Sequence, residues 1–128
     1  MLKKFRKMLK KQEGFTLVEL MVAVVILGIL AGIGVQQYGR IQRDAKIAAH
    51  NANVRIITNA ANMYIMMEGT APDEIKDLVP GFLQEPVPKP PAGLDYGDVE
   101  EYTLDVTPPG DDDDGIWQVD VKPGIISE

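Results

Sequence analysis

Residues 15–35 of the 128-residue chain read FTLVELMVAVVILGILAGIGV, and Glu19 is the only charged residue in this run. A helix of this length spans about 30 Å, the thickness of the hydrocarbon core of a bilayer. The run therefore predicts a membrane-spanning helix with a single carboxylate near its start. A charge in hydrocarbon is costly, so Glu19 requires a functional explanation.

The charge of the chain divides sharply at the start of this run. Residues 1–14 carry six Lys or Arg and one Glu, whereas residues 15–128 carry seven basic and eighteen acidic residues. A basic segment before an apolar run keeps the N-terminus in the cytoplasm and sends the remainder outward. A basic segment is also typical of nucleic-acid-binding arms. Here the apolar run follows at once and the remainder is acidic, so we infer no specific nucleic-acid partner.

Two ordinary membrane signals fit the run incompletely. A secretory signal has an apolar core of about 7–15 residues followed by a small-residue cleavage site. This run is longer, and the helical pattern continues beyond it without a clear break. A plain uncleaved anchor explains the length but neither Glu19 nor the order of residues around Gly14.

The segment KKQEGFTLVELMVAVVILGILAGIGVQQYGRIQRDAK (residues 10–46) resembles the N-terminal segment of type IV pilins and of the pseudopilins of type II secretion systems. The resemblance covers residues 3–46. It implies that prepilin peptidase cuts between Gly14 and Phe15 and methylates the new amino group of Phe15. It also implies an inner-membrane assembly platform and self-association of the mature chain into a helical filament.

The resemblance also assigns a role to Glu19, as the partner of the Phe15 amine of a neighbouring subunit. Cleavage creates an α-amino group, whose ordinary pKa is about 7.7–8. Each charge alone costs on the order of 3 kcal/mol at mid-membrane, and pairing relieves both. Removing one partner of a buried pair costs about 3–5 kcal/mol. We therefore expect the pair to set the register of assembly.

The helix is expected to continue past the membrane, because no proline occurs between Phe15 and Ala71. We expect it to end near Glu68, with Gly69 as its stop. A buried stripe is predicted at steps of three or four by Ile41, Ala45, Ala49, Ala52, Ile56, Ala60, Met63 and Met67, widened by Val54, Ile57, Ala61 and Ile65.

The helix departs from the family pattern at Gln36, where many members have a proline that makes a hinge. The nearby glycines are Gly28, Gly32, Gly34 and Gly39. Interior glycines weaken a helix, and spacings such as that of Gly28 and Gly32 also permit close helix packing. A replacement hinge and a packing surface both remain open.

Residues 70–128 predict a small acidic head. Residues 70–79 read as a short helix capped by Thr70 and Asp73. Residues 101–107 and 115–121 alternate apolar and polar residues, as half-buried strands do. The inward-facing side chains are then Tyr102, Leu104, Val106, Trp117, Val119 and Val121. Two strands are marginal alone, so we expect them to pack on the long helix.

The expected architecture is thus a pilin-like α+β fold, in which a long N-terminal helix packs against a small antiparallel sheet. The expected boundaries are a removed leader at 1–14, a transmembrane or filament-core helix at 15–39, its amphipathic continuation at 40–69 and the head at 70–128.

The loop between the predicted strands contains four consecutive carboxylates, Asp111, Asp112, Asp113 and Asp114. Calcium takes six to eight oxygen ligands, so the loop is a weak calcium candidate. Adjacent aspartates cannot all face one ion, and the usual C-terminal calcium motif of major pseudopilins is absent. A solvated acidic loop is the favoured interpretation.

Other chemistry-bearing residues point to structural roles. His50 is read as a solvated or packing histidine, and Met63, Met66 and Met67 as core residues. The chain has no cysteine, and neither Thr103 nor Thr107 has a base at a recognisable spacing, so we expect no enzyme activity.

The function expected from these observations is that of a structural subunit of a type IV pilus or pilus-like filament. It would be a single-pass inner-membrane protein in contact with lipid before assembly, then part of an extracellular or envelope-spanning filament. A type II secretion pseudopilin is the alternative within this class. A monomeric membrane-anchored binding module, with or without calcium, is the alternative from another class.

Overall fold

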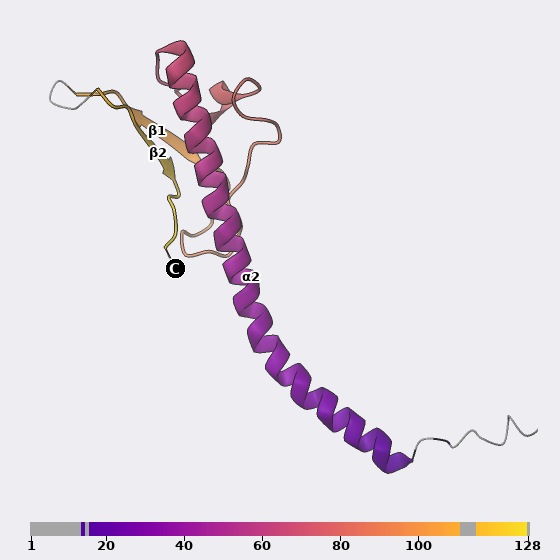
Figure 1. Ribbon diagram of the computed structural model, residues 1–128. Coiled ribbons are helices and arrows are strands. Elements are labelled where there is room, and N and C mark those ends of the chain that lie inside the picture. The colour runs from indigo at the N-terminus through magenta and orange to yellow at the C-terminus, as the bar shows by residue number, and fades with distance from the viewer. Residues whose placement is uncertain (1–13, 15, 111–114, 128) are drawn as a thin grey trace, which may run out of the picture. The chain divides into compact units, whose positions relative to one another are not determined.

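The computed structural model describes residues 14, 16–110 and 115–127 (Figure 1). Its elements are α2 (Leu17–Glu68), the short 3₁₀ helix η1 (Ile75–Leu78), β1 (Thr103–Thr107) and β2 (Gln118–Lys122). The chain divides into two units, residues 1–40 and 41–128, and each is described by itself. The predicted α+β class is confirmed, with a long helix followed by a small antiparallel sheet.

Helix α2 runs without a break through the glycines and through Gln36. It ends at Glu68, as predicted, and Gly69 follows with φ of 71°, a conformation that costs glycine little. The Gly69 N–H donates to the Ile65 carbonyl at 2.9 Å, which completes the last turn. The helix begins at Leu17, two residues later than expected.

The buried face of α2 consists of Ile47, His50, Val54, Ile57, Ala60, Ala61 and Ile65. Most of the predicted stripe was therefore wrong, because Ile41, Ala45, Ala49, Ala52, Ile56, Met63 and Met67 are exposed. Their neighbour Met66 is exposed as well, so the three methionines are not core residues. The helix has apolar residues on two sides, and the head covers only one of them.

Strands β1 and β2 pair as an antiparallel hairpin beside the second half of α2 (Figure 1). Leu104 lies opposite Val121 and Val106 opposite Val119. Alternate residues face inward, so the predicted inward set is confirmed for both strands. Tyr102 and Val121 join Ile57 in the core of the head.

The segment after α2 closes the core from another side. Ile75 and Leu78 of η1 are buried, together with Leu83 from the following turn. The predicted cap of this helix was wrong: Glu74 is the cap residue, and Asp77 Oδ2 accepts the N–H groups of Asp73 (3.0 Å) and Glu74 (2.9 Å). Asp77 reaches back because carboxylates satisfy free N–H groups at helix starts.

His50 joins α2 to the rest of the head. It is fully buried; its Nε2 lies 2.7 Å from the Gly124 carbonyl, and the Tyr102 hydroxyl lies 3.0 Å from its Nδ1. Because a carbonyl only accepts, Nε2 carries a hydrogen and donates it to Gly124, while Nδ1 and the Tyr102 hydroxyl share the second hydrogen bond. The packing role expected for His50 is thus confirmed, and the solvated one is excluded.

The chain after β2 is held by the next residue of α2. The Asn51 amide donates to the Ile126 carbonyl and accepts the Ile126 N–H, each at 2.9 Å. On another side of α2, Lys46 donates to the Ala92 carbonyl at 3.0 Å and Arg43 pairs with Asp95 at 2.6 Å. Polar side chains of one helix thus fix backbone segments that have no regular structure.

The two adjacent isoleucines of α2 provide a matched test of the helix face that the head covers. Ile57 is fully buried, whereas Ile56 is 49% exposed. We expect Ile57→Ala to lower the free energy of unfolding of the head by about 2–5 kcal/mol, because the buried side chain leaves a cavity. Ile56→Ala should cost less than about 1 kcal/mol. Denaturant unfolding of the full chain in detergent measures both, and equal losses would contradict the assignment.

Ionisation of the tyrosines around His50 should weaken the fold at high pH. Burial raises the pKa of Tyr102. The pKa of Tyr96 is also raised, mainly by burial and to a lesser extent by the charge of the neighbouring Tyr102. Tyrosine in an unfolded chain ionises near pH 10, so this contribution to stability is complete below about pH 10 and is lost as pH rises through the folded pKa values. Ultraviolet titration should therefore show tyrosinate forming later in the native than in the denaturant-unfolded chain. Coincident curves would refute this.

Candidate functional site

The predicted processing and assembly motif lies at the start of α2. Gly14 is exposed and outside the helix, and Phe15 lies outside the described residues. The Thr16 N–H donates to Glu19 Oε2 at 2.9 Å, and the Glu19 N–H donates to Thr16 Oγ1 at 3.2 Å. This is the reciprocal arrangement of a capping box.

The capping box was missed in the sequence, although its signature, Thr-x-x-Glu before an apolar run, is present in residues 16–19. It gives Glu19 a role within its own chain. The Glu19 carboxylate points back toward the start of the helix and binds the N–H of Thr16, the residue that follows Phe15 in the sequence. The position suits an anion, because the free N–H groups at a helix start carry partial positive charge.

The part of α2 that follows is apolar on every side. Large side chains from Leu17 to Val35 are more than half exposed in the isolated chain. None of the glycines at 28, 32, 34 and 39 has a neighbouring atom within 4 Å of the place a Cβ would occupy. By length and composition, α2 is a helix that could cross a membrane. A surface of this kind needs lipid or other apolar helices around it.

The predicted calcium candidates, Asp111 to Asp114, lie outside the described residues. Within residues 14, 16–110 and 115–127, no group of three or more His, Cys, Asp or Glu is placed to hold a metal ion. The calcium hypothesis stays a prediction about the loop alone.

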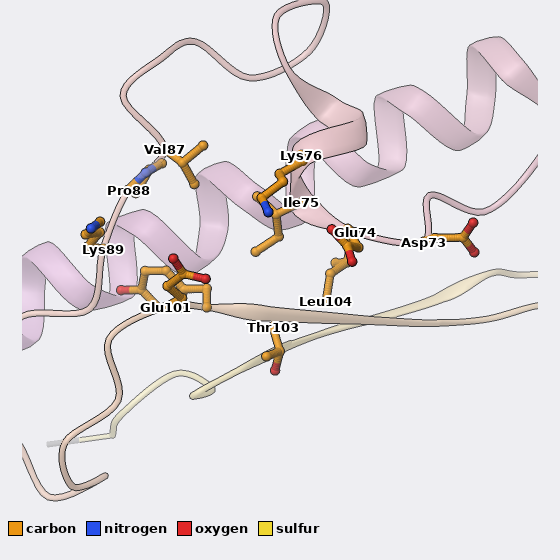
Figure 2. Close-up of a pocket in the computed structure, with 11 residues that line it drawn as sticks. Asp73, Glu74, Ile75, Lys76, Val87, Pro88, Lys89, Glu101, Thr103 and Leu104 are labelled. Carbon is orange, nitrogen blue, oxygen red and sulfur yellow. The ribbon is translucent and has the colours of Figure 1, made fainter.

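A cavity of about 460 Å³ lies in the head between η1, residues 87–89 and the start of β1 (Figure 2). Ile75, Val87 and Leu104 give it apolar walls, and charged side chains of both signs stand around it. Two lining residues carry hydroxyls, Tyr102 and Thr103. The Thr103 hydroxyl donates to the Lys122 carbonyl at 3.5 Å, and the Tyr102 hydroxyl lies 3.0 Å from His50 Nδ1. No base among the described residues is hydrogen-bonded to the Thr103 hydroxyl, and the cavity includes none of the predicted site residues.

The N-terminal part of the chain is similar to several known proteins. The prokaryotic N-terminal methylation motif matches residues 9–35. Type II secretion system core protein G of Pseudomonas aeruginosa is 44% identical over 55 residues, which are 43% of this chain and 39% of that protein. A fimbrial protein of Pseudomonas aeruginosa is 38% identical over 58 residues, 45% of this chain and 38% of that protein. This chain thus spans under two fifths of the length of both relatives.

The similarity to other relatives extends over the head. Type II secretion system core protein G of Pectobacterium carotovorum subsp. carotovorum is 30% identical over 138 residues, covering 88% of each chain. No solved structure gives a significant match.

Proposed function

Because this chain belongs to the family of pilins and pseudopilins, which are structural subunits and not enzymes, we propose that it is a pseudopilin of a type II secretion system. The single observation that carries the proposal is the 88% coverage of the Pectobacterium core protein G. The similarity to the fimbrial protein covers 45% of this chain. We therefore favour the secretion filament over the type IV pilus, which was the first expectation from the sequence.

The exposed surface of α2 supports a filament subunit over a monomeric membrane-anchored binding module. Residues 17–39 are exposed on all sides, and the exposed apolar residues continue along α2 as far as Met67. An anchor needs apolar surface only within the bilayer. A helix that leaves the bilayer to pack among copies of itself needs it over a greater length, because water would otherwise contact it.

Cleavage between Gly14 and Phe15 is consistent with the exposed apolar surface of α2, because it removes the charged leader that precedes this helix. The leader carries a net charge of +5 in residues 1–14. Retaining those charges would hold the start of the helix at the cytoplasmic surface, since each is costly in hydrocarbon. Removal by prepilin peptidase leaves α2 able to move out of the inner membrane. The mature subunit then begins with the methylated amine of Phe15 and passes to the assembly platform.

Glu19 then has one role in the single chain and a second role in the filament. In the single chain its carboxylate closes the capping box with Thr16. In the filament it pairs with the Phe15 amine of a neighbour, where a charge without a partner would be costly. The capping box orients the carboxylate toward the end of the helix before a neighbour arrives.

Deletion of this chain from its host should stop type II secretion, because the growing filament would lack its subunit. Exported substrates should accumulate behind the outer membrane, and restoring the chain should release them. Assay of secreted and cell-retained substrate checks this. Unchanged secretion together with the loss of surface pili would refute the pseudopilin proposal in favour of a pilus.

Two substitutions of Glu19 separate its charge from its capping role. Glu19→Gln keeps an oxygen that accepts the Thr16 N–H but removes the charge, and Glu19→Ala removes both. We expect both variants to enter the membrane and to be cut after Gly14, and both to lower filament yield at least about tenfold. Intact-mass measurement checks cleavage and methylation, and electron microscopy of sheared material checks yield. A normal yield from Glu19→Gln would contradict the ion pair.

A further inference from the structure

The cavity between η1, residues 87–89 and the start of β1 lies along an edge of the sheet. Strand β1 has one hydrogen-bonded neighbour in the described part of the head, and this neighbour is β2. Residues 101–104 line the cavity in succession, and no residue of β2 does. Neighbouring residues of a strand point to opposite faces, so a cavity that contacts four in succession follows the edge of the strand. The cavity therefore borders the edge of β1 that β2 leaves open.

The open edge of β1 carries backbone groups that the sheet does not use. In an antiparallel pair, alternate residues direct their N–H and C=O groups toward the partner strand, and the residues between them direct theirs to the other side. Groups on an open edge pair with water or with another extended chain. The cavity leaves room beside this edge for such a chain.

The walls of the cavity are apolar beside the strand edge. Ile75 is buried, and Val87 and Leu104 are half-buried. Every second side chain of an added strand would point to one side, so a strand along β1 can direct alternate side chains toward these walls. The walls favour apolar residues at those alternate positions.

Two lysines make the cavity the most basic part of an acidic head. Residues 70–128 contain three basic and fifteen acidic residues. Two of the three basic residues, Lys76 and Lys89, line the cavity from different walls, and both are exposed. The third, Lys122, lies 3.9 Å from Asp105 and 3.8 Å from Asp120. Among the described residues, no carboxylate forms an ion pair with Lys76 or Lys89. This placement favours an anionic ligand.

The carboxylates of the lining only partly offset the two lysines. The Glu74 side chain accepts the Asp77 N–H in the cap of η1, and Asp73 lies at the far end of the lining from both amines (Figure 2). Glu101 stands on the strand side of the cavity (Figure 2). Two amines and one nearby carboxylate leave a positive charge at the opening.

We propose that the cavity binds an extended peptide segment of another protein, in which apolar and acidic residues alternate and whose backbone pairs with the open edge of β1. The apolar side chains lie against Ile75, Val87 and Leu104, and the carboxylates on the opposite side of the peptide reach the amines of Lys76 and Lys89. Main-chain hydrogen bonds give affinity to such a complex, and the side-chain contacts give it specificity. The site belongs to the head of a single chain, so it goes beyond the subunit role and does not depend on it.

A synthetic peptide tests the charge preference. The probe is a blocked pentapeptide of sequence glutamate–valine–threonine–valine–glutamate, titrated calorimetrically into the full chain in phosphatidylcholine nanodiscs. We expect it to bind at least about tenfold more tightly than the same peptide with both glutamates replaced by glutamine, because charge-assisted contacts are stronger than neutral ones. Absence of binding, or equal affinity for the two peptides, would overturn the proposal.

Backbone methylation of the probe tests strand pairing. Adjacent N–H groups of an extended peptide point to opposite sides, so only one of two neighbours can face β1. We expect N-methylation of the central threonine and of the valine after it to have unequal effects, with one abolishing binding and the other leaving it. Equal effects at the two positions would refute pairing with the strand edge.

Substitutions in the chain test the two lysines. Lys76→Gln and Lys89→Gln should each weaken binding of the glutamate peptide by about threefold, the size expected for an exposed ion pair. Arg55→Gln is the matched control, because Arg55 is exposed on α2 and does not line the cavity. It should leave the affinity unchanged. Equal affinities of all three variants and the parent chain would contradict the role of the lysines.

Octanoate distinguishes a peptide from a small amphiphile, which could use the walls and the amines but not the strand edge. Binding of octanoate by a chain that does not bind the peptide would overturn the proposal. The titrations involve neither assembly nor secretion, so their failure leaves the pseudopilin function standing. Peptide binding by a chain whose deletion leaves secretion intact would instead support this site and refute that function.

Discussion

Apolar side chains surround residues 17–39 of α2 on every side, and water is a poor solvent for such a surface. Lipid or apolar protein must cover it at each stage of the life of the subunit. Under the proposed function, the basic residues before Gly14 would hold this segment in the membrane by their charge, and cleavage would release it. The acidic head is too polar to enter hydrocarbon, so the proposed function places it outside the bilayer.

The need to cover apolar surface has a different outcome in the second half of α2. There the head covers one face, with Ile57, Leu78 and Tyr102 in its core. The opposite face stays apolar and open, which is unusual for a soluble surface but expected for a helix that meets other copies of itself. Backbone carbonyls bound by His50, Asn51 and Lys46 keep the head on its own face, so the open face remains accessible.

In the N-terminal motif Glu19 has a local role, to which the proposed function adds an intermolecular one. Thr16 and Glu19 satisfy each other's N–H groups at a helix start that would otherwise leave them free. The resemblance to pilins pointed to Glu19 through its place in a sequence motif, whereas the capping box is visible in the same four residues and was overlooked. The proposed pairing of Glu19 with a neighbour would form only in the assembly, and a single chain contains only one half of it.

The sequence by itself determined the long helix, its end at Glu68 before Gly69, the two alternating strands and the family, because each depends on local pattern or on a specific N-terminal motif. Tertiary structure alone decided which side of α2 is buried, since apolar residues such as Ile56 and Ile57 stand next to each other and periodicity favours neither face. It also decided the role of His50, whose partners include the carbonyl of Gly124. Every residue has a backbone carbonyl, so no sequence signal marks the one that folding brings to a buried imidazole.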